Sequence, residues 1–144
     1  MKLPSGRSVS IDTPIYLDSH FTWGEATKNC TRIPRDLYIN GSLCATAIAI
    51  ENRIINIAKR LDKLRTNLGN RPILVTSWYR PSSVNRSVGG AIWSRHLFGD
   101  AVDIKSLYFS PLEIYKLAEP NHDGGIGCYS TFVHIDWRGK KARW

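Results

Sequence analysis

The sequence contains no long apolar run. None of its 144 residues belongs to a hydrophobic stretch near the roughly 20 residues that a helix needs to cross a bilayer. Its first segment, MKLPSGRSVSIDTP, is interrupted by Pro4, Gly6 and Ser8, where a signal peptide would need a continuous apolar core. We therefore expect no membrane span, and we recognise no signal peptide in this chain.

Closely spaced cysteines are also missing. Cys30, Cys44 and Cys128 form no C-x-x-C pair, which argues against a zinc site made of cysteines. Cys30 and Cys44 could close a short loop as a disulfide in an oxidising compartment, but the odd number of cysteines favours buried free thiols. The chain also lacks internal repeats and low-complexity tracts.

Acidic residues are scarce beside basic ones. Lysine and arginine number 20 and aspartate and glutamate number 12, so the net charge is +8 and the pI is about 9.7. This balance favours a polyanionic partner, and both nucleic acid and an anionic cell wall qualify. A solvated basic face explains it equally well. The sequence has no recognisable nucleic-acid-reading motif, so a nucleic-acid binder ranks last among the functions considered.

The residues that are present predict an α+β fold. From about Thr46 to Leu68 apolar residues recur every three or four positions, which indicates a long amphipathic helix that ends at Gly69. A T-x-x-E capping box at Thr22 predicts a short helix, and Ser110 before Pro111 predicts the start of another. Further predictions are a strand or arm over 9–17, a turn at 40–41, strands at 72–79, 101–105 and 131–137, a loop or short helix at 81–90, and a glycine-rich loop at 121–127. The helices come first and the short strands are clustered late, which favours an α+β fold. We expect residues 1–20 to form an arm and residues 21–144 to form a single domain of ordinary size.

Two short segments carry residues suited to metal chemistry. Strand alternation places Asp103 of AVDI on one face, and His134 and Asp136 of FVHID on one face. If the two strands are neighbours, these three residues meet, and His96 can join them from a loop that turns at Gly99. Two histidines and one aspartate suit zinc, although the same set also suits non-haem iron, and Asp103 with His134 could form a plain buried ion pair.

Longer motifs around these residues resemble a known family. SWYRP, NRSVGGAIWSRHLFGDAVDI and GIGCYSTFVHIDWRGKKARW, with HFTWGEATKN upstream, are similar to the zinc D-Ala-D-Ala carboxypeptidase and murein endopeptidase family, which shares its fold with the hedgehog signalling domain. The resemblance is nearest to bacterial and phage peptidases with S-x-H-x-x-G-x-A-x-D and F-V-H-x-D motifs. It implies a small antiparallel sheet flanked by helices, with one zinc held by His96, Asp103 and His134. It also implies that Arg80 polarises the substrate carbonyl, for which a surface ion pair is the alternative. Ser94 matches the motif serine beside the first ligand, and we expect it to make a local hydrogen bond.

The sequence departs from this family at the catalytic carboxylate. Many relatives carry Asp or Glu three residues before the last histidine, where this chain has Thr131, which cannot act as a base. Asp136, on the same strand face as His134, is the best substitute, and a role in orienting a metal ligand is the alternative. His122 and Asp123 are weaker candidates, since polar loop residues are commonly just solvated.

The resemblance implies a zinc-dependent peptidase that hydrolyses peptidoglycan stem peptides or cross-links, of DD-carboxypeptidase or endopeptidase type. The alternative is a zinc-bearing wall-binding module that does not cleave. We expect a monomer acting on peptidoglycan outside the cytoplasm, in the periplasm or wall, or delivered to the wall as a phage lysin.

Overall fold

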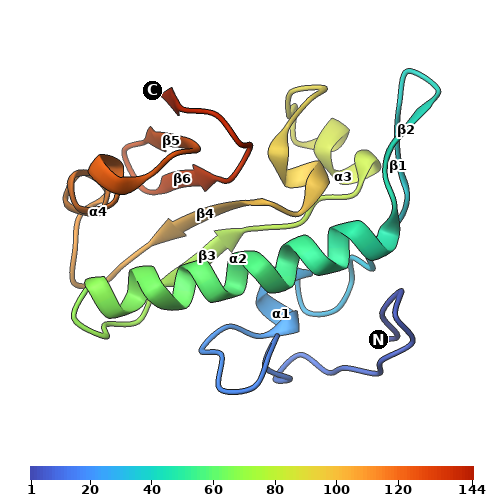
Figure 1. Cartoon of the computed structure of the whole chain (residues 1–144), viewed down its shortest axis with the longest axis horizontal. Coiled ribbons are helices and arrows are strands. Elements are labelled where there is room, and N and C mark those ends of the chain that lie inside the picture. The colour runs from blue at the N-terminus through green and yellow to red at the C-terminus, as the bar shows by residue number, and fades with distance from the viewer.

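The computed structural model describes all 144 residues, which form helices and two sheets (Figure 1). The elements in chain order are α1 (Trp23–Ala26), β1 (Leu37–Ile39), β2 (Ser42–Ala45), α2 (Ala47–Asn67), β3 (Leu74–Ser77), α3 (Ser82–Ser87), the 3-10 helix η1 (Arg95–Phe98), β4 (Ala101–Lys105), α4 (Pro111–Ala118), the 3-10 helix η2 (Glu119–Asn121), β5 (Gly125–Cys128), β6 (Val133–Asp136) and β7 (Ala142–Arg143). The predicted α+β fold is confirmed. No helix in the structure has the length and apolar character of a membrane span.

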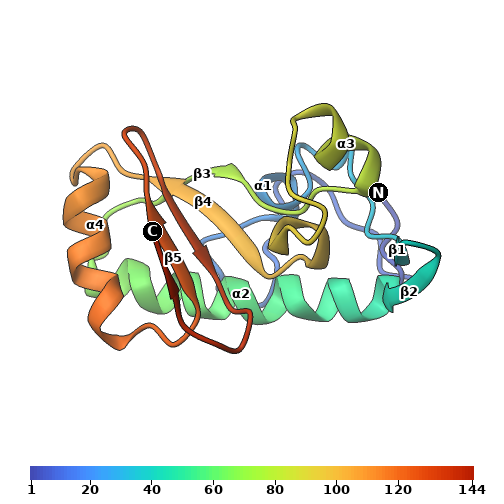
Figure 2. The same cartoon turned by 90° about the horizontal axis from the view of Figure 1, so that it is seen from above.

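The main sheet has five strands in the order β3-β4-β6-β5-β7. The first four strands pair antiparallel to one another, and β7 pairs with β5 in parallel. Strands β1 and β2 form a separate hairpin around the predicted turn at Asn40 and Gly41. Seen from above, β5 and β6 run across α2 (Figure 2). The central strands β4 and β6 are therefore enclosed by partners on both edges.

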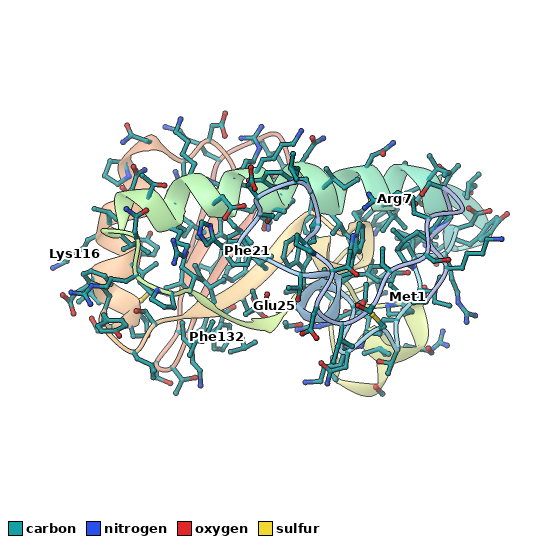
Figure 3. The ribbon with its side chains drawn as sticks, turned by 90° about the horizontal axis from the view of Figure 1, so that it is seen from below. Met1, Arg7, Phe21, Glu25, Lys116 and Phe132 are labelled. Atoms are coloured by element: carbon teal, nitrogen blue, oxygen red, sulfur yellow. The ribbon has the colours of Figure 1, made fainter.

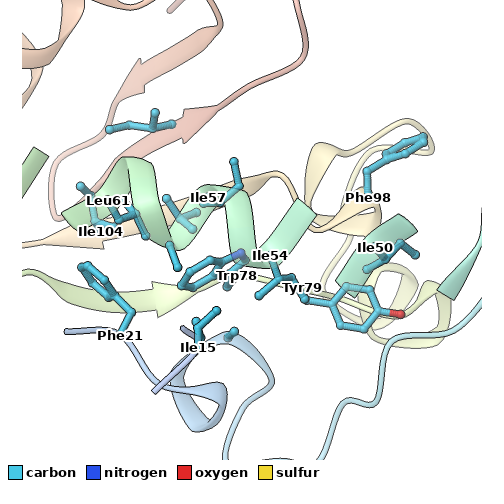
Figure 4. Close-up of a cluster of buried hydrophobic side chains, with 14 of the residues drawn as sticks. Ile15, Phe21, Ile50, Ile54, Ile57, Leu61, Trp78, Tyr79, Phe98 and Ile104 are labelled. Atoms are coloured by element: carbon cyan, nitrogen blue, oxygen red, sulfur yellow. The ribbon is translucent and has the colours of Figure 1, made fainter. Parts of the chain in front are cut away.

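The long helix α2 supplies much of the core. Thr46 caps its start by accepting a hydrogen bond from the Ala49 backbone N–H at 3.1 Å. Apolar residues at helical spacing face inward and are buried, among them Ile50, Ile54 and Leu61. They pack against aromatic side chains from the sheet and the N-terminal segment (Figure 4), including Phe21, Trp78 and Tyr79. This packing fixes the sheet on α2.

The first 20 residues lie against the same core. Leu3, Val9 and Ile15 are buried in it, and the Ser5 hydroxyl and backbone N–H both donate to the buried Glu51 carboxylate of α2. Seen from below, the segment from Met1 to Phe21 crosses the molecule, while Lys116 points away from it (Figure 3). The segment contains only isolated bridges and no strand.

Most of the predicted elements are confirmed, with one correction. The helix at 46–68, the capping box at Thr22 and the helix that starts at Pro111 all appear as predicted. The segment at 81–90 contains a helix, α3. The predicted glycine-rich loop at 121–127 is wrong in its second half, because Gly125–Cys128 forms β5 between two other strands. All three cysteines are free and half-buried.

Candidate metal centre

The pairing of β4 with β6 brings the first two candidate residues together. Asp103 lies directly opposite His134 in the antiparallel register. Their strand neighbours Val102, Ile104 and Ile135 are buried in the core, so Asp103 and His134 share the other face of the sheet. The His134 Nδ1 atom lies 2.9 Å from Asp103 Oδ1.

His96 reaches the same point from η1. The Ser94 hydroxyl accepts a hydrogen bond from the His96 backbone N–H at 3.3 Å, as expected for a local role. Gly99 ends η1 with φ of +78°, and a Cβ there would lie 3.1 Å from Ile50 Cγ2 of α2. A side chain at this position would therefore be strained both by the backbone angle and by the close approach to α2. The turn leaves His96 Nε2 at 3.2 Å from Asp103 Oδ1.

The donor set fits a metal ion. One ligand atom each from His96, Asp103 and His134 lies within 4.8 Å of the other two. The second nitrogen of each histidine is engaged, because His96 Nδ1 lies 2.7 Å from the Trp78 carbonyl and His134 Nε2 lies 2.8 Å from Asp136 Oδ2. These acceptors hold a proton on the outer nitrogens and leave the inner nitrogens free to coordinate. Without a cation, both inner nitrogens would also need a proton to face the same Asp103 oxygen.

Charge in the cluster follows from burial and hydrogen bonding. Burial raises the pKa of Asp103, but hydrogen bonds from His134 and His96 outweigh it and lower the pKa to about 2. Burial lowers the pKa of His134, but hydrogen bonds to Asp103 and Asp136 outweigh it and raise the pKa above its ordinary value. The Asp103 carboxylate is thus ionised at neutral pH, which is the form that binds cations.

Arg80 borders the cluster. Its backbone N–H donates to the His96 carbonyl at 3.1 Å, and its Nε donates to Ser77 Oγ at 3.1 Å. One guanidinium nitrogen, Nη2, lies 3.4 Å from Asp103 Oδ2, and the side chain is 19% exposed. The arginine is therefore an anchored cation beside the candidate ligands, with part of its surface open to a substrate.

Asp136 is placed differently from a solvent-facing base. Its side chain has no exposed surface. Oδ1 accepts from the Gly125 backbone N–H and from the backbone N–H and Nε of Arg138, while Oδ2 accepts from Arg138 Nη2 and His134 Nε2. A Cβ at Gly125 would lie 2.5 Å from Oδ2, so glycine makes room for the carboxylate. Burial raises the pKa of Asp136, but Arg138 and His134 outweigh it and hold it well below its usual range.

A cavity of about 420 Å³ opens above the cluster. Asp103 is the only carboxylate among its lining residues, and aromatic side chains form much of its wall, namely Trp93, Tyr129, Phe132 and Trp144. The Trp144 indole N–H donates to the Tyr129 hydroxyl at 2.7 Å, and its ring lies 5.3 Å from that of His134. Sequence reasoning missed these aromatic residues. Trp144, for example, reaches the site only because β7 returns beside β5.

The other candidates lie elsewhere. His122 Nε2 lies 2.8 Å from the Asp136 carbonyl and 3.0 Å from the Gly125 carbonyl, and its ring packs on Trp137. Asp123 is exposed, and neither it nor His122 lines the cavity above the cluster. Thr131 is exposed in the turn between β5 and β6. The structure therefore brings His96, Asp103, His134 and Arg80 to one cavity and leaves the loop residues outside it.

Comparison with known proteins agrees with this arrangement. The model of the family described as peptidase M15 matches residues 19–136, which include all four site residues. The chain is 32% identical over 99 residues to "Probable peptidoglycan L,D-endopeptidase MepK" of Haemophilus influenzae, covering 58% of this chain and 53% of that protein. It is 35% identical over 65 residues to "Zinc D-Ala-D-Ala carboxypeptidase" of Streptomyces albus G, covering 45% of this chain and 25% of that protein. The chain thus spans about half of the first relative and a quarter of the second. Because the family model covers most of its length, the chain belongs to the peptidase M15 family.

Proposed function

We propose that the protein is a zinc-dependent peptidase that hydrolyses peptide bonds in peptidoglycan stem peptides or cross-links. The observation that carries this proposal is the convergence of His96, Asp103 and His134 beneath an open cavity, with their ligand atoms within 4.8 Å of one another. The family and the names of the two relatives support the substrate and the metal.

In this proposal one zinc ion is held by His96 Nε2, His134 Nδ1 and an Asp103 carboxylate oxygen. A zinc ion in such a site lowers the pKa of a coordinated water and polarises a carbonyl group. The Trp78 carbonyl and the Asp136 carboxylate would orient the two histidines by accepting their outer protons, and zinc on the inner nitrogens would keep both rings neutral.

Arg80 stabilises the negative charge that develops on the substrate oxygen. Its guanidinium is anchored through Ser77 and partly exposed in the cavity, so it can donate without rearranging. The aromatic wall around Tyr129 and Trp144 offers flat surfaces on which the substrate packs.

We assign Asp136 to orienting His134, the second of the two roles that the sequence left open. Its five hydrogen bonds and complete burial support this role, because a carboxylate that removes a proton from water must reach the cavity. The site is complete within one chain, which is consistent with a monomer acting at the cell wall.

A second candidate is a zinc-bearing wall-binding module without hydrolytic activity. It is favoured by one observation: apart from Asp103, no carboxylate lines the cavity, and the exposed Thr131 takes the place of the usual acid. Digestion of purified peptidoglycan with the zinc-loaded protein separates the two candidates. A peptidase releases fragments whose masses identify the cleaved bond, and a binding module sediments with the wall and releases none.

A further inference from the structure

A second cavity borders the candidate metal centre. It has a volume of about 450 Å³, and Arg80 lines both it and the cavity above the metal cluster. Its lining also includes Arg32, Arg35 and Arg86, and we refer to it as the arginine cavity. The four arginines come from two segments of the chain, near residues 31–37 and 79–86, so the fold gathers their charge at one place.

This positive charge is largely unpaired. Arg80 contacts Asp103 at 3.4 Å, whereas Arg32, Arg35 and Arg86 form no ion pair. The single acid in the lining, Asp36, already accepts a hydrogen bond from the Ala47 backbone N–H at 2.8 Å, at the start of α2. Like charges gathered without counter-charges are unfavourable, and a bound anion relieves their repulsion.

The cavity is also anchored. Arg32 is half-buried and its Nη1 donates to the Tyr79 carbonyl at 3.2 Å, while the Arg35 backbone N–H donates to the Tyr79 hydroxyl at 3.2 Å. Burial, with a contribution from the charge of Arg80, lowers the pKa of Arg32. Tyr79 itself is buried in the core, so it fixes one side of the cavity next to the metal centre.

We propose that the arginine cavity binds a free carboxylate of the substrate, on a residue next to the bond that is cleaved. The inference rests on the proposed function for the identity of the peptide. A peptide that lies across the metal centre and continues past Arg80 would place its next residue among Arg32, Arg35 and Arg86. Guanidinium groups match the planar, two-oxygen shape of a carboxylate, and stem peptides carry free carboxylates along their length.

The test compares a synthetic stem peptide with variants in which each free carboxylate is converted, one at a time, to a carboxamide. Arg35 and Arg86 are exposed and their side chains make no hydrogen bond, so the double change Arg35→Gln with Arg86→Gln should leave the fold intact. Arg7→Gln is the matched control, because Arg7 is also exposed and lies on the N-terminal segment (Figure 3). KM and kcat are measured for each protein and peptide.

We expect one carboxamide to raise KM for the wild-type protein by about 10- to 100-fold, the effect of losing a hydrogen bond to a charged group. In the double variant the same carboxamide should no longer raise KM, because the arginines that bind the carboxylate are gone. The kcat of the double variant should stay close to that of the wild type, because the carboxylate is bound equally before and during the reaction. The Arg7 variant should behave as wild type. Equal KM for every peptide, or a carboxylate preference that survives in the double variant, overturns the proposal.

Binding of an uncleavable analogue separates this inference from the proposed function. The analogue has a methyleneamine in place of the scissile amide, and its affinity is measured by calorimetry. If the protein digests no wall but binds the analogue with the same carboxylate and arginine dependence, the peptidase proposal fails and the carboxylate site stands. If the arginine changes weaken binding of a glycerol phosphate polymer and not of the peptide, the cavity binds wall phosphate and the carboxylate site is wrong.

Discussion

Changing Asp136 to Asn tests how the protein prepares its metal ligands. Asparagine has nearly the same shape as aspartate, but it replaces one acceptor oxygen by an NH2 donor. The two oxygens of Asp136 accept five hydrogen bonds, from Gly125, Arg138 and His134, so the new donor must face other donors at one of these positions. His134 can relieve the conflict by accepting at Nε2, which moves its proton to Nδ1.

That tautomer cannot coordinate through Nδ1, the nitrogen that faces Asp103. Loss of a group that supports a metal ligand typically weakens metal affinity by about 10- to 100-fold. We therefore expect Asp136→Asn to bind zinc about 10- to 100-fold more weakly than wild type and to lose hydrolysis at limiting zinc, with partial recovery when zinc is added in excess.

Zinc affinity is measured by competition with a chromophoric chelator. Asp123→Asn is the matched control, because Asp123 is an exposed carboxylate of the neighbouring loop and should have no effect. Thermal unfolding of the metal-free proteins reports any loss of fold. Unchanged zinc affinity together with lost hydrolysis would refute the positioning role and support the hypothesis that Asp136 removes the proton.

Three further predictions concern the rest of the chain. Arg80→Ala should keep zinc and lower kcat by about 100- to 1000-fold, as for loss of one donor to a developing oxyanion, which steady-state kinetics measures. Gly99→Ala should lower the free energy of unfolding, measured in urea, by more than the roughly 1–2 kcal/mol that a left-handed backbone costs a residue with a side chain. The extra loss arises because the new Cβ would lie 3.1 Å from Ile50. Gly69→Ala is the control, because Gly69 has a similar φ of +72° but open space around it. Asp62 of α2 accepts hydrogen bonds from Tyr16, Ser19 and the His20 backbone N–H of the N-terminal segment. Burial raises the pKa of Asp62, but these hydrogen bonds lower it overall, so Asp62→Asn should reduce Tm at neutral pH, with a difference that shrinks below about pH 4.

The sign of the last effect follows from the direction of the shift. A carboxyl group whose pKa is depressed by folding contributes stability above its unfolded pKa and loses it as the pH falls through the folded value. A difference in Tm that stays constant from pH 7 to pH 3 would contradict the role of Asp62. Unchanged turnover in Arg80→Ala would contradict the role of Arg80 in catalysis. Equal destabilisation by Gly99→Ala and Gly69→Ala would contradict the steric role of Gly99.

The parts of the site that the sequence predicts well are those governed by local periodicity. Alternation in AVDI and FVHID places Asp103 and His134 on the polar faces of two strands, and the structure pairs them directly. Gly99 predicts the turn that delivers His96, because only glycine tolerates its backbone angle without strain. These features depend on residues within a few positions of one another.

The parts that depend on distant contacts are not predictable in this way. Gly125 and Gly127 indicate a loop, yet they lie in β5, which pairs with β6 and β7. Glycine is present there for space, because a Cβ at the first would strike Asp136 and a Cβ at the second would strike Trp144. Alternation correctly puts Asp136 on the face of His134, but it says nothing of Arg138, which covers the carboxylate and closes it from the cavity. The role of a polar strand residue therefore follows from what packs over it.

The most direct test of the account is a titration of the metal-free protein with zinc while soluble peptide release from purified peptidoglycan is measured. Hydrolysis should rise with added zinc and reach its plateau at about one zinc per chain, and His134→Ala should show neither tight zinc binding nor hydrolysis. Hydrolysis that survives removal of all metal, or tight binding of one zinc without any release of peptide, would contradict it.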